Sequence, residues 1–136
     1  MKKLNKYGEG IRHITKEEEG LTIGVIKYPK TISEDISHNF TRSEYFFLDS
    51  IADKLGLLDN NTIKAIAKLD KRDTFSKETG FDIVDLKLEV KFYDRMERHY
   101  QSLMVALVNI INKLSKKKQY YREKRNIALG ELKKYN

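Results

Sequence analysis

Apolar residues recur every three or four positions between residues 76 and 114, and this is the strongest pattern in the chain. The residues that follow it are Ile83, Leu86, Val90, Tyr93, Met96, Tyr100, Leu103, Leu107, Ile110 and Leu114. This spacing places side chains on one face of a helix, so it predicts a long amphipathic helix. At residues 103–111 the apolar surface is wider than one face and needs a cover. We therefore expect a homodimer formed by helix packing.

The pattern lapses at residues 115–118 and resumes before the C-terminus. The apolar residues with which it resumes are Tyr120, Tyr121, Ile127, Ala128, Leu129, Leu132 and Tyr135. Two arrangements fit them. Either a second helix folds back on the first, or one continuous helix carries a solvated collar at residues 115–118.

Weaker patterns occupy the first third of the chain. Residues 21–28 are rich in β-branched and aromatic side chains and predict a strand that Pro29 closes. Residues 1–20 are polar and contain three glycines, so we expect a flexible arm there. Residues 31–39 are polar and are expected to be irregular.

The middle of the chain predicts one helix and one ambiguous segment. A helix is predicted over residues 43–55, capped by Ser43 and followed by Gly56. Residues 62–69 alternate between apolar and charged positions, which predicts a strand. Residues 51–69 also resemble a helix-turn-helix. In that alternative the residues that face DNA would be Lys64, Lys68, Lys71 and Arg72.

Together these elements predict an α+β protein that is mostly α. A flexible polar arm at residues 1–20 precedes a small α+β head at residues 21–75, which holds two or three strands and one helix. Residues 76–136 form a helical region with a long amphipathic helix and a basic C-terminal helix. The basic segment of that region spans residues 113–136.

The net charge of the chain is concentrated at its end. The protein has 27 Lys and Arg against 20 Asp and Glu, which gives +7. Residues 113–136 contain nine of the basic and two of the acidic residues, so they carry all of this excess. A localised positive field favours phosphate or acidic protein partners.

Aromatic side chains are interleaved with the cations of this segment. The candidate binding residues are Lys113, Lys116, Lys117, Lys118, Tyr120, Tyr121, Arg122, Lys124 and Arg125. Lys and Arg can hold phosphates, and tyrosine rings can stack on exposed bases. We therefore expect a non-enzymatic protein that docks on nucleic acid or on a host nucleoprotein complex. The alternatives are an inhibitor that contacts an acidic host protein without nucleic acid, and a merely solvated helix face.

A catalytic alternative rests on the alternation in residues 84–93. An acid followed by Glu-x-Lys on a strand resembles the core of metal-dependent nucleases, in which the acids hold Mg²⁺ and the lysine positions water. Asp82, Glu89 and Lys91 would fill these roles. The same residues also fit the helical pattern, so strand and helix remain open for this segment.

Other kinds of chemistry find little support in the sequence. The chain has no cysteine, and its three histidines, His13, His38 and His99, lack metal-ligand spacing. We expect no cofactor and no resident metal. No run of about 18 apolar residues occurs, and the basic start does not lead into an apolar stretch. The sequence predicts a cytoplasmic protein without a membrane partner.

Residues 65–83 resemble a segment of small uncharacterised phage and prophage proteins. The matching positions are Ala65, Ala67, Lys68, Asp73, Thr74, Phe75, Glu78, Gly80 and Ile83. In those proteins a strand that ends in a basic residue leads through a D-x-F turn into a helix. The resemblance favours the strand at residues 62–69 and implies a phage or mobile-element origin without catalytic residues. It also implies a protein of the host cytosol that regulates or inhibits a host or defence system, as an anti-CRISPR protein does.

Overall fold

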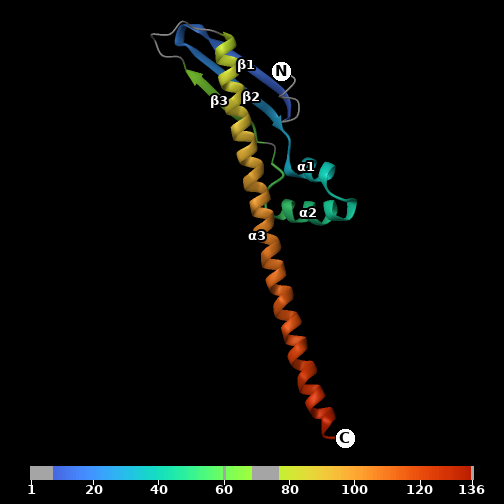
Figure 1. The fold of residues 1–136 in the computed structure, drawn as a ribbon. Coiled ribbons are helices and arrows are strands. Elements are labelled where there is room, and N and C mark those ends of the chain that lie inside the picture. The colour runs from blue at the N-terminus through green and yellow to red at the C-terminus, as the bar shows by residue number, and fades with distance from the viewer. Residues whose placement is uncertain (1–7, 60, 69–76, 136) are drawn as a thin grey trace. The chain divides into compact units, whose positions relative to one another are not determined.

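The structure is a computed structural model that describes residues 8–59, 61–68 and 77–135. Within these residues one antiparallel sheet of three strands is combined with three α-helices (Figure 1). In chain order the elements are β1 (Gly8–Lys16), the short 3-10 helix η1 (Glu17–Glu19), β2 (Leu21–Pro29), α1 (Ile32–Asn39), α2 (Arg42–Lys54), β3 (Ile63–Lys68) and α3 (Lys77–Lys133). The predicted fold class, α+β and mostly α, is confirmed.

The chain divides into two compact units. The first, Met1–Gln101, contains the sheet, α1, α2 and the beginning of α3, and the second, Ser102–Asn136, contains the rest of α3. The predicted boundary between head and helical region, at residues 75 and 76, lies outside the described residues.

The predicted flexible arm at residues 1–20 is wrong for residues 8–20, which contain β1, and residues 1–7 lie outside the described residues. β1 pairs with β2 along its length, from Gly8 opposite Pro29 to Lys16 opposite Leu21. Gly20 joins the two strands at a φ of 64°, which glycine adopts without steric cost. β1 contains too few apolar residues to predict a strand from the sequence. Its backbone pairing with β2 stabilises it instead.

A histidine attaches β1 to α3. His13 Nε2 lies 2.7 Å from Asp85 Oδ1, and its ring packs against Phe81 at a centroid distance of 4.3 Å. The His13 side chain is almost fully buried. This contact gives His13 a packing role in the head.

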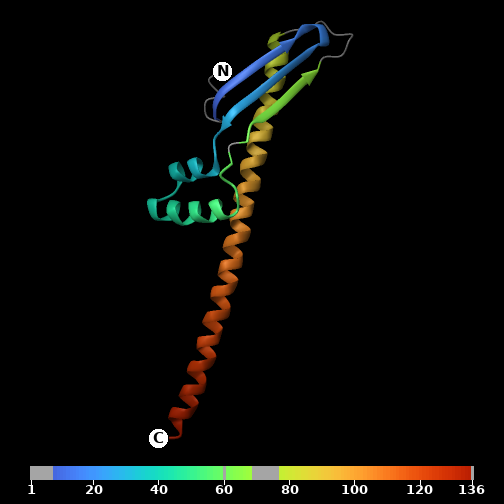
Figure 2. The same ribbon diagram turned by 180° about the vertical axis from the view of Figure 1, so that it is seen from behind.

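One face of the sheet is buried beneath the beginning of α3 (Figures 1 and 2). A methyl group added to Gly24 of β2 would lie 2.0 Å from Val84 Cγ1, and one added to Gly80 of α3 would lie 2.2 Å from Thr22 Oγ1. The two backbones therefore approach so closely that only glycine fits at these positions. The remaining small residues of this face are Ala65 and Ala67, and both are buried.

Between Gly80 and Phe92 this packing selects a different face of α3 from the one that the apolar pattern predicts. The buried residues there follow a spacing of four and are Gly80, Val84, Leu88 and Phe92. Met96 and Leu103 of the predicted stripe are buried as expected. Leu86 and Val90, both in the predicted stripe, are 61% and 67% exposed. Apolar side chains occur nearly all round the helix here, so periodicity alone could not identify the face that the sheet covers.

α3 is a single helix, which settles two alternatives. It continues through residues 115–118, so the arrangement with one continuous helix is confirmed and the folded-back helix is wrong. The strand alternative at residues 84–93 is also wrong. No proline occurs in residues 77–133, so every residue of α3 can contribute its backbone N–H to the helix. Among the described residues, no helix is both long and apolar enough to cross a membrane.

β3 confirms the strand prediction for residues 62–69 and rules out the helix-turn-helix. Ile63, Ala65 and Ala67 are buried and alternate with exposed side chains, as in a strand with one covered face. β3 pairs antiparallel with β2 at the edge of the sheet. Of the residues expected to face DNA, Lys71 and Arg72 lie outside the described residues.

Of the two short helices, α1 was not predicted, and α2 was predicted with a different N-cap. Residues 31–39, expected to be irregular, contain α1, because the Thr31 side chain caps it and Ile32 and Ile36 bury one face. The predicted helix at residues 43–55 is confirmed as α2. Its cap is Thr41, which forms a capping box with Glu44, and not Ser43.

Three basic side chains of α3 close the outer edge of β3. Lys87 Nζ donates to the carbonyl of Ile66 at 2.7 Å, and Lys91 Nζ donates to the carbonyl of Lys64 at 2.5 Å. Arg95 Nη1 donates to the carbonyl of Asn61 at 2.6 Å. An edge strand offers unpaired backbone groups to other chains, and these three donors occupy the acceptors along it.

A buried polar group connects α1 to α3. Asp35 accepts hydrogen bonds from the Tyr100 hydroxyl and, at 3.0 Å, from Lys30 Nζ. Burial raises the pKa of Asp35, but these two donors and nearby His38 outweigh it, so the pKa lies below its ordinary value. The same contact and burial raise the pKa of Tyr100.

We expect acid to destabilise the first unit. Burial, reinforced by Arg95 and Arg98, lowers the pKa of His99 below 6.5. The unfolded chain then binds this proton more readily, so the free energy of unfolding falls as the pH drops below about 6.5. Asp35 adds a second loss below about pH 3.8. Urea unfolding at about pH 7.5 and 5.5 measures the first effect. His99→Gln should reduce the difference, and an equal fall in both proteins would contradict this origin.

Candidate nucleic-acid interface

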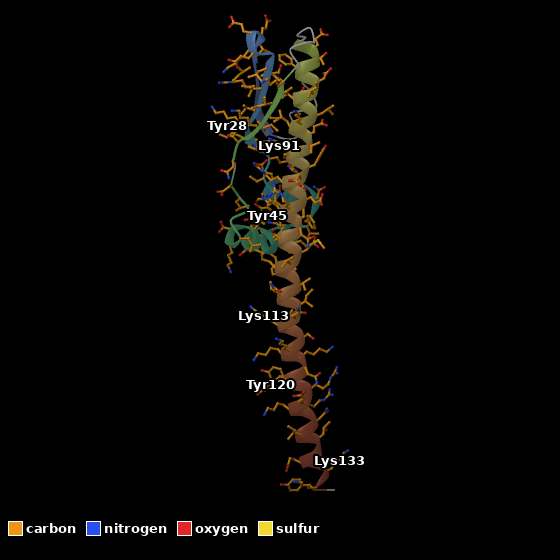
Figure 3. All side chains as sticks on the ribbon, turned by 90° about the vertical axis from the view of Figure 1, so that its left-hand side faces the viewer. Tyr28, Tyr45, Lys91, Lys113, Tyr120 and Lys133 are labelled. Carbon is orange, nitrogen blue, oxygen red and sulfur yellow. The ribbon has the colours of Figure 1, made fainter. Side chains whose placement is uncertain are left out.

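The basic segment predicted at residues 113–136 lies on the C-terminal part of α3, in the second unit. Every described side chain from residue 111 to residue 135 is exposed (Figure 3). All nine candidate binding residues are therefore on one exposed helix, with no gap in the backbone between them.

Among the described residues, the cations from Lys113 to Arg125 have no acidic partner, whereas Lys134 has one. Among the described residues, Glu123 accepts a hydrogen bond from Gln119 at 3.2 Å, and Glu131 pairs with Lys134 at 3.3 Å. No ion pair joins a carboxylate to any of the seven basic residues from Lys113 to Arg125 in the part of the chain that the structure describes. Their charge is available to an external anion.

The two tyrosines have different surroundings. Lys117 Nζ and Lys124 Nζ each lie 5.5 Å from the ring centroid of Tyr120, so two cations flank this ring. Tyr121 is 65% exposed and meets Tyr120 edge to face at 5.1 Å. Both rings are exposed, Tyr120 at 47%, and Tyr120 makes cation–π contacts with the two lysines on either side of it.

The helix arranges these residues in two neighbouring ridges. A spacing of three and four places Lys113, Lys117, Tyr120 and Lys124 along one ridge. The same spacing places Lys118, Arg122 and Arg125 along the second, with Tyr121 between the two. The remaining side of the helix carries Lys116, Gln119 and Glu123. The segment thus presents a positive surface that covers more than half of the helix.

The nuclease alternative loses the strand on which it depends. Asp82, Glu89 and Lys91 all lie on α3, and Lys91 is bonded to the carbonyl of Lys64. Seven residues of helix separate Asp82 from Glu89 by about 10 Å along the axis, too far for both to bind one ion. The described residues contain no group of three or more His, Asp or Glu side chains that could hold a metal.

The first unit has a groove beside the β3 edge. Its volume is about 760 Å³, and its lining residues are Lys64, Ala65, Ile66, Leu86, Lys87, Val90 and Lys91. The lining is aliphatic with lysines, and it contains neither a carboxylate nor a histidine. The ionisable groups of its lining are therefore the three lysines.

Sequence reasoning missed a second group of cations, which the sheet brings together. Arg12, Lys16, Lys27, Lys64 and Lys68 are all exposed, and their positions in the strands place them on the sheet face opposite α3. Their charge was hidden because residues 1–112 are neutral in sum. The alternation of side chains along each strand could have identified them, because the cations of one strand are separated by even numbers of residues and so share a face.

Comparison of the chain with protein-family models gives no match, and comparisons with curated proteins and with solved structures give none either. The resemblance of residues 65–83 to phage proteins stays a prediction. Residues 69–76, which contain its D-x-F turn, lie outside the described residues.

Proposed function

We propose that the protein binds nucleic acid through residues 113–125 of α3, by surface complementarity and without chemistry. The observation that carries this proposal is the row of exposed cations on one helix that have no carboxylate partner among the described residues. Phosphates bound there would release condensed counterions, which supplies most of the affinity of such contacts. Tyr121 adds a surface on which an unpaired base can stack.

The salt dependence of binding tests this proposal. Labelled duplex DNA, single-stranded DNA and RNA are titrated with the full chain at several salt concentrations. With about six phosphate contacts, the logarithm of the association constant should fall with that of the salt concentration at a slope near −5 for a duplex. Affinity should drop by about a thousandfold between 50 and 200 mM salt. Absence of binding at the lowest salt would refute the proposal.

We also propose that two copies of the chain associate through α3. Apolar side chains share one face of the second unit, where Leu107 is half-buried and Met104, Val108, Ile111 and Leu114 are exposed. This face continues into the ridge of Lys118, Arg122 and Arg125. In a parallel pair the apolar positions would pack and the cations would repel. Bound phosphates would relieve that repulsion, so dimerisation and nucleic-acid binding would support each other.

A charge on the apolar face should dissociate this dimer. Val108→Glu with Ile111→Glu is expected to raise the dimer dissociation constant by at least about a hundredfold, because four buried aliphatic side chains per dimer are lost. Asn109→Glu with Asn112→Glu is the matched control, since it adds the same two charges on the same turns at polar positions. Sedimentation equilibrium at high salt, where the cations are screened, measures the constant. A wild-type protein that stays monomeric there contradicts the proposal.

The biological setting is a hypothesis of its own. The resemblance of residues 65–83 supports a phage or mobile-element protein that regulates or inhibits a host or defence system. Nucleic-acid binding by residues 113–125 is compatible with this setting and does not depend on it.

A further inference from the structure

The face of the sheet that is turned away from α3 has an ordered arrangement of side chains. The register of β1, β2 and β3 places residues opposite one another in three rows across the strands. The rows are Arg12–Val25–Lys64, Ile14–Ile23–Ile66 and Lys16–Leu21–Lys68. We call these residues, with Lys27, the cationic sheet face.

This face is open. Thr22, Gly24 and Ile26 point to the other side, where they are buried, so the alternate residues of β2 point away from α3. Ile14 and Ile66, at the two ends of the middle row, are 41% and 45% exposed. An aliphatic row thus crosses the sheet without a cover from the described residues.

Cations border the aliphatic row on both sides. On one side of it lies the row that begins with Arg12 and ends with Lys64. On the other side lies the row that begins with Lys16 and ends with Lys68. Neighbouring rows are about 7 Å apart along the strands, and the outer strands are about 10 Å apart across the sheet. None of the strand residues whose side chains the structure describes is acidic. The described strand residues of the cationic sheet face therefore carry only positive charge around an apolar centre, and the exposed glutamates of η1, Glu17–Glu19, follow Lys16 at one corner.

These features select among the possible partners. A second copy of the same face would bring like charges together, which opposes self-association. A nucleic-acid strand would match the cations, but none of the nine residues in the three rows is aromatic, and phosphates offer nothing to the aliphatic row. Tyr28, whose ring lies 5.5 Å from Lys27 Nζ, stands outside these rows. A protein surface with apolar side chains between carboxylates matches both the centre and the border.

We propose that the cationic sheet face binds an acidic protein segment in which apolar side chains are flanked by Asp or Glu. The aliphatic row supplies the apolar contact, and the four corner cations fix the position of the segment through its carboxylates. This site belongs to the first unit and is independent of the nucleic-acid proposal for residues 113–125.

A binding experiment with defined peptides tests the site. The protein is the full chain with six glutamine substitutions in the basic segment, at Lys116, Lys117, Lys118, Arg122, Lys124 and Arg125, so that this segment cannot bind the probe. The probe is a labelled helical peptide with leucines along one side and glutamates on both flanks. A glutamate peptide of equal charge without leucine is the matched probe. We expect the leucine peptide to bind at least about tenfold more tightly, because only it contacts the aliphatic row.

Variants of the face complete the test. Lys64→Gln with Lys68→Gln should weaken binding of the leucine peptide about tenfold, and Ile14→Thr with Ile66→Thr should remove its advantage over the glutamate peptide. Arg42→Gln with Lys54→Gln removes two exposed charges from α2 and should have little effect. Circular dichroism and thermal unfolding confirm that each variant is folded.

Several outcomes would overturn the proposal. Equal binding of the two peptides would show attraction by charge alone. Equal loss in the α2 control would show an effect of net charge. Tighter, face-dependent binding of phosphatidylserine vesicles or of an oligonucleotide would assign the face to another partner class. Because the basic segment is substituted throughout, failure here leaves the nucleic-acid proposal unaffected.

Discussion

A glutamine variant of the basic segment is expected to lose at least about a hundredfold in nucleic-acid affinity at 50 mM salt. It replaces six exposed cations, namely Lys116, Lys117, Lys118, Arg122, Lys124 and Arg125. Glutamine supports a helix nearly as well as lysine and arginine do, so α3 should persist. The loss would follow from the removal of phosphate contacts, and the salt slope should approach zero with it. Fluorescence anisotropy with a labelled duplex measures both quantities.

The cationic sheet face provides the control for this prediction. Four glutamines in the basic segment, at Lys117, Lys118, Arg122 and Arg125, remove the same charge as four on the sheet face, at Arg12, Lys16, Lys64 and Lys68. If the interface is local, only the first set weakens nucleic-acid binding strongly. Equal losses would mean that the net charge of the protein, and not the segment, attracts nucleic acid.

Gly24→Ala is expected to destabilise the first unit by about 2–3 kcal/mol or more. The added methyl group would lie 2.0 Å from Val84 Cγ1 and 2.9 Å from Leu88 Cδ1. Both side chains are fully buried, so neither can move without displacing the helix from the sheet. The midpoint of urea unfolding should fall accordingly.

Two further variants show whether this loss comes from the close approach. Gly130→Ala, on the exposed end of α3, has no atom within 4 Å of the new methyl group and should be neutral or stabilise by up to about 1 kcal/mol. Val84→Ala removes the clashing methyl group, so part of the loss should be recovered when it is combined with Gly24→Ala. A Gly24→Ala protein as stable as the wild type would contradict the packing described for the sheet and α3.

The elements that sequence predicted well are those with a strong local pattern. α3, α2, β2 and β3 each combine regular spacing with a clear end, such as Pro29 or Gly56. β1 and α1 were missed because their stability comes from other segments. Pairing with β2 fixes β1, and the buried side chains of Ile32 and Ile36 fix an otherwise polar α1.

The choice of the buried face of α3 shows a limit of another kind. Periodicity in residues 83–93 favoured Leu86, Val90 and Tyr93, yet the sheet covers Val84 and Leu88. The small residues of the sheet decide this, since Gly24 admits a close helix at one place. Complementarity between distant segments cannot be read from the spacing within one of them.

Only those cations that are neighbours in the sequence could be predicted as a candidate site. The cations of residues 113–125 are adjacent in the sequence, so a count of charges along the chain is enough to find them. Arg12 and Lys64 are far apart along the chain, and only the register of the sheet brings them to one face. Acidic residues elsewhere in residues 1–112 balance these cations, so the net charge of that part of the chain does not reveal them.

At the closed edge of β3, the repeat of a helix lies beside the repeat of a strand, and the two differ slightly in length. Four residues of helix rise about 6.0 Å, and two residues of strand span about 6.7 Å. One step along α3, from Lys87 to Lys91, therefore nearly equals one step back along β3, from Ile66 to Lys64. The small mismatch accumulates, and the next donor is the longer Arg95, which reaches a carbonyl beyond the strand. A slip of β3 by one residue would leave backbone carbonyls opposite the lysines, but it would turn the charged side chains of β3 toward α3 and its small buried residues away from it. The lysines of α3 therefore close the edge of β3, and the alternation of its side chains fixes the register.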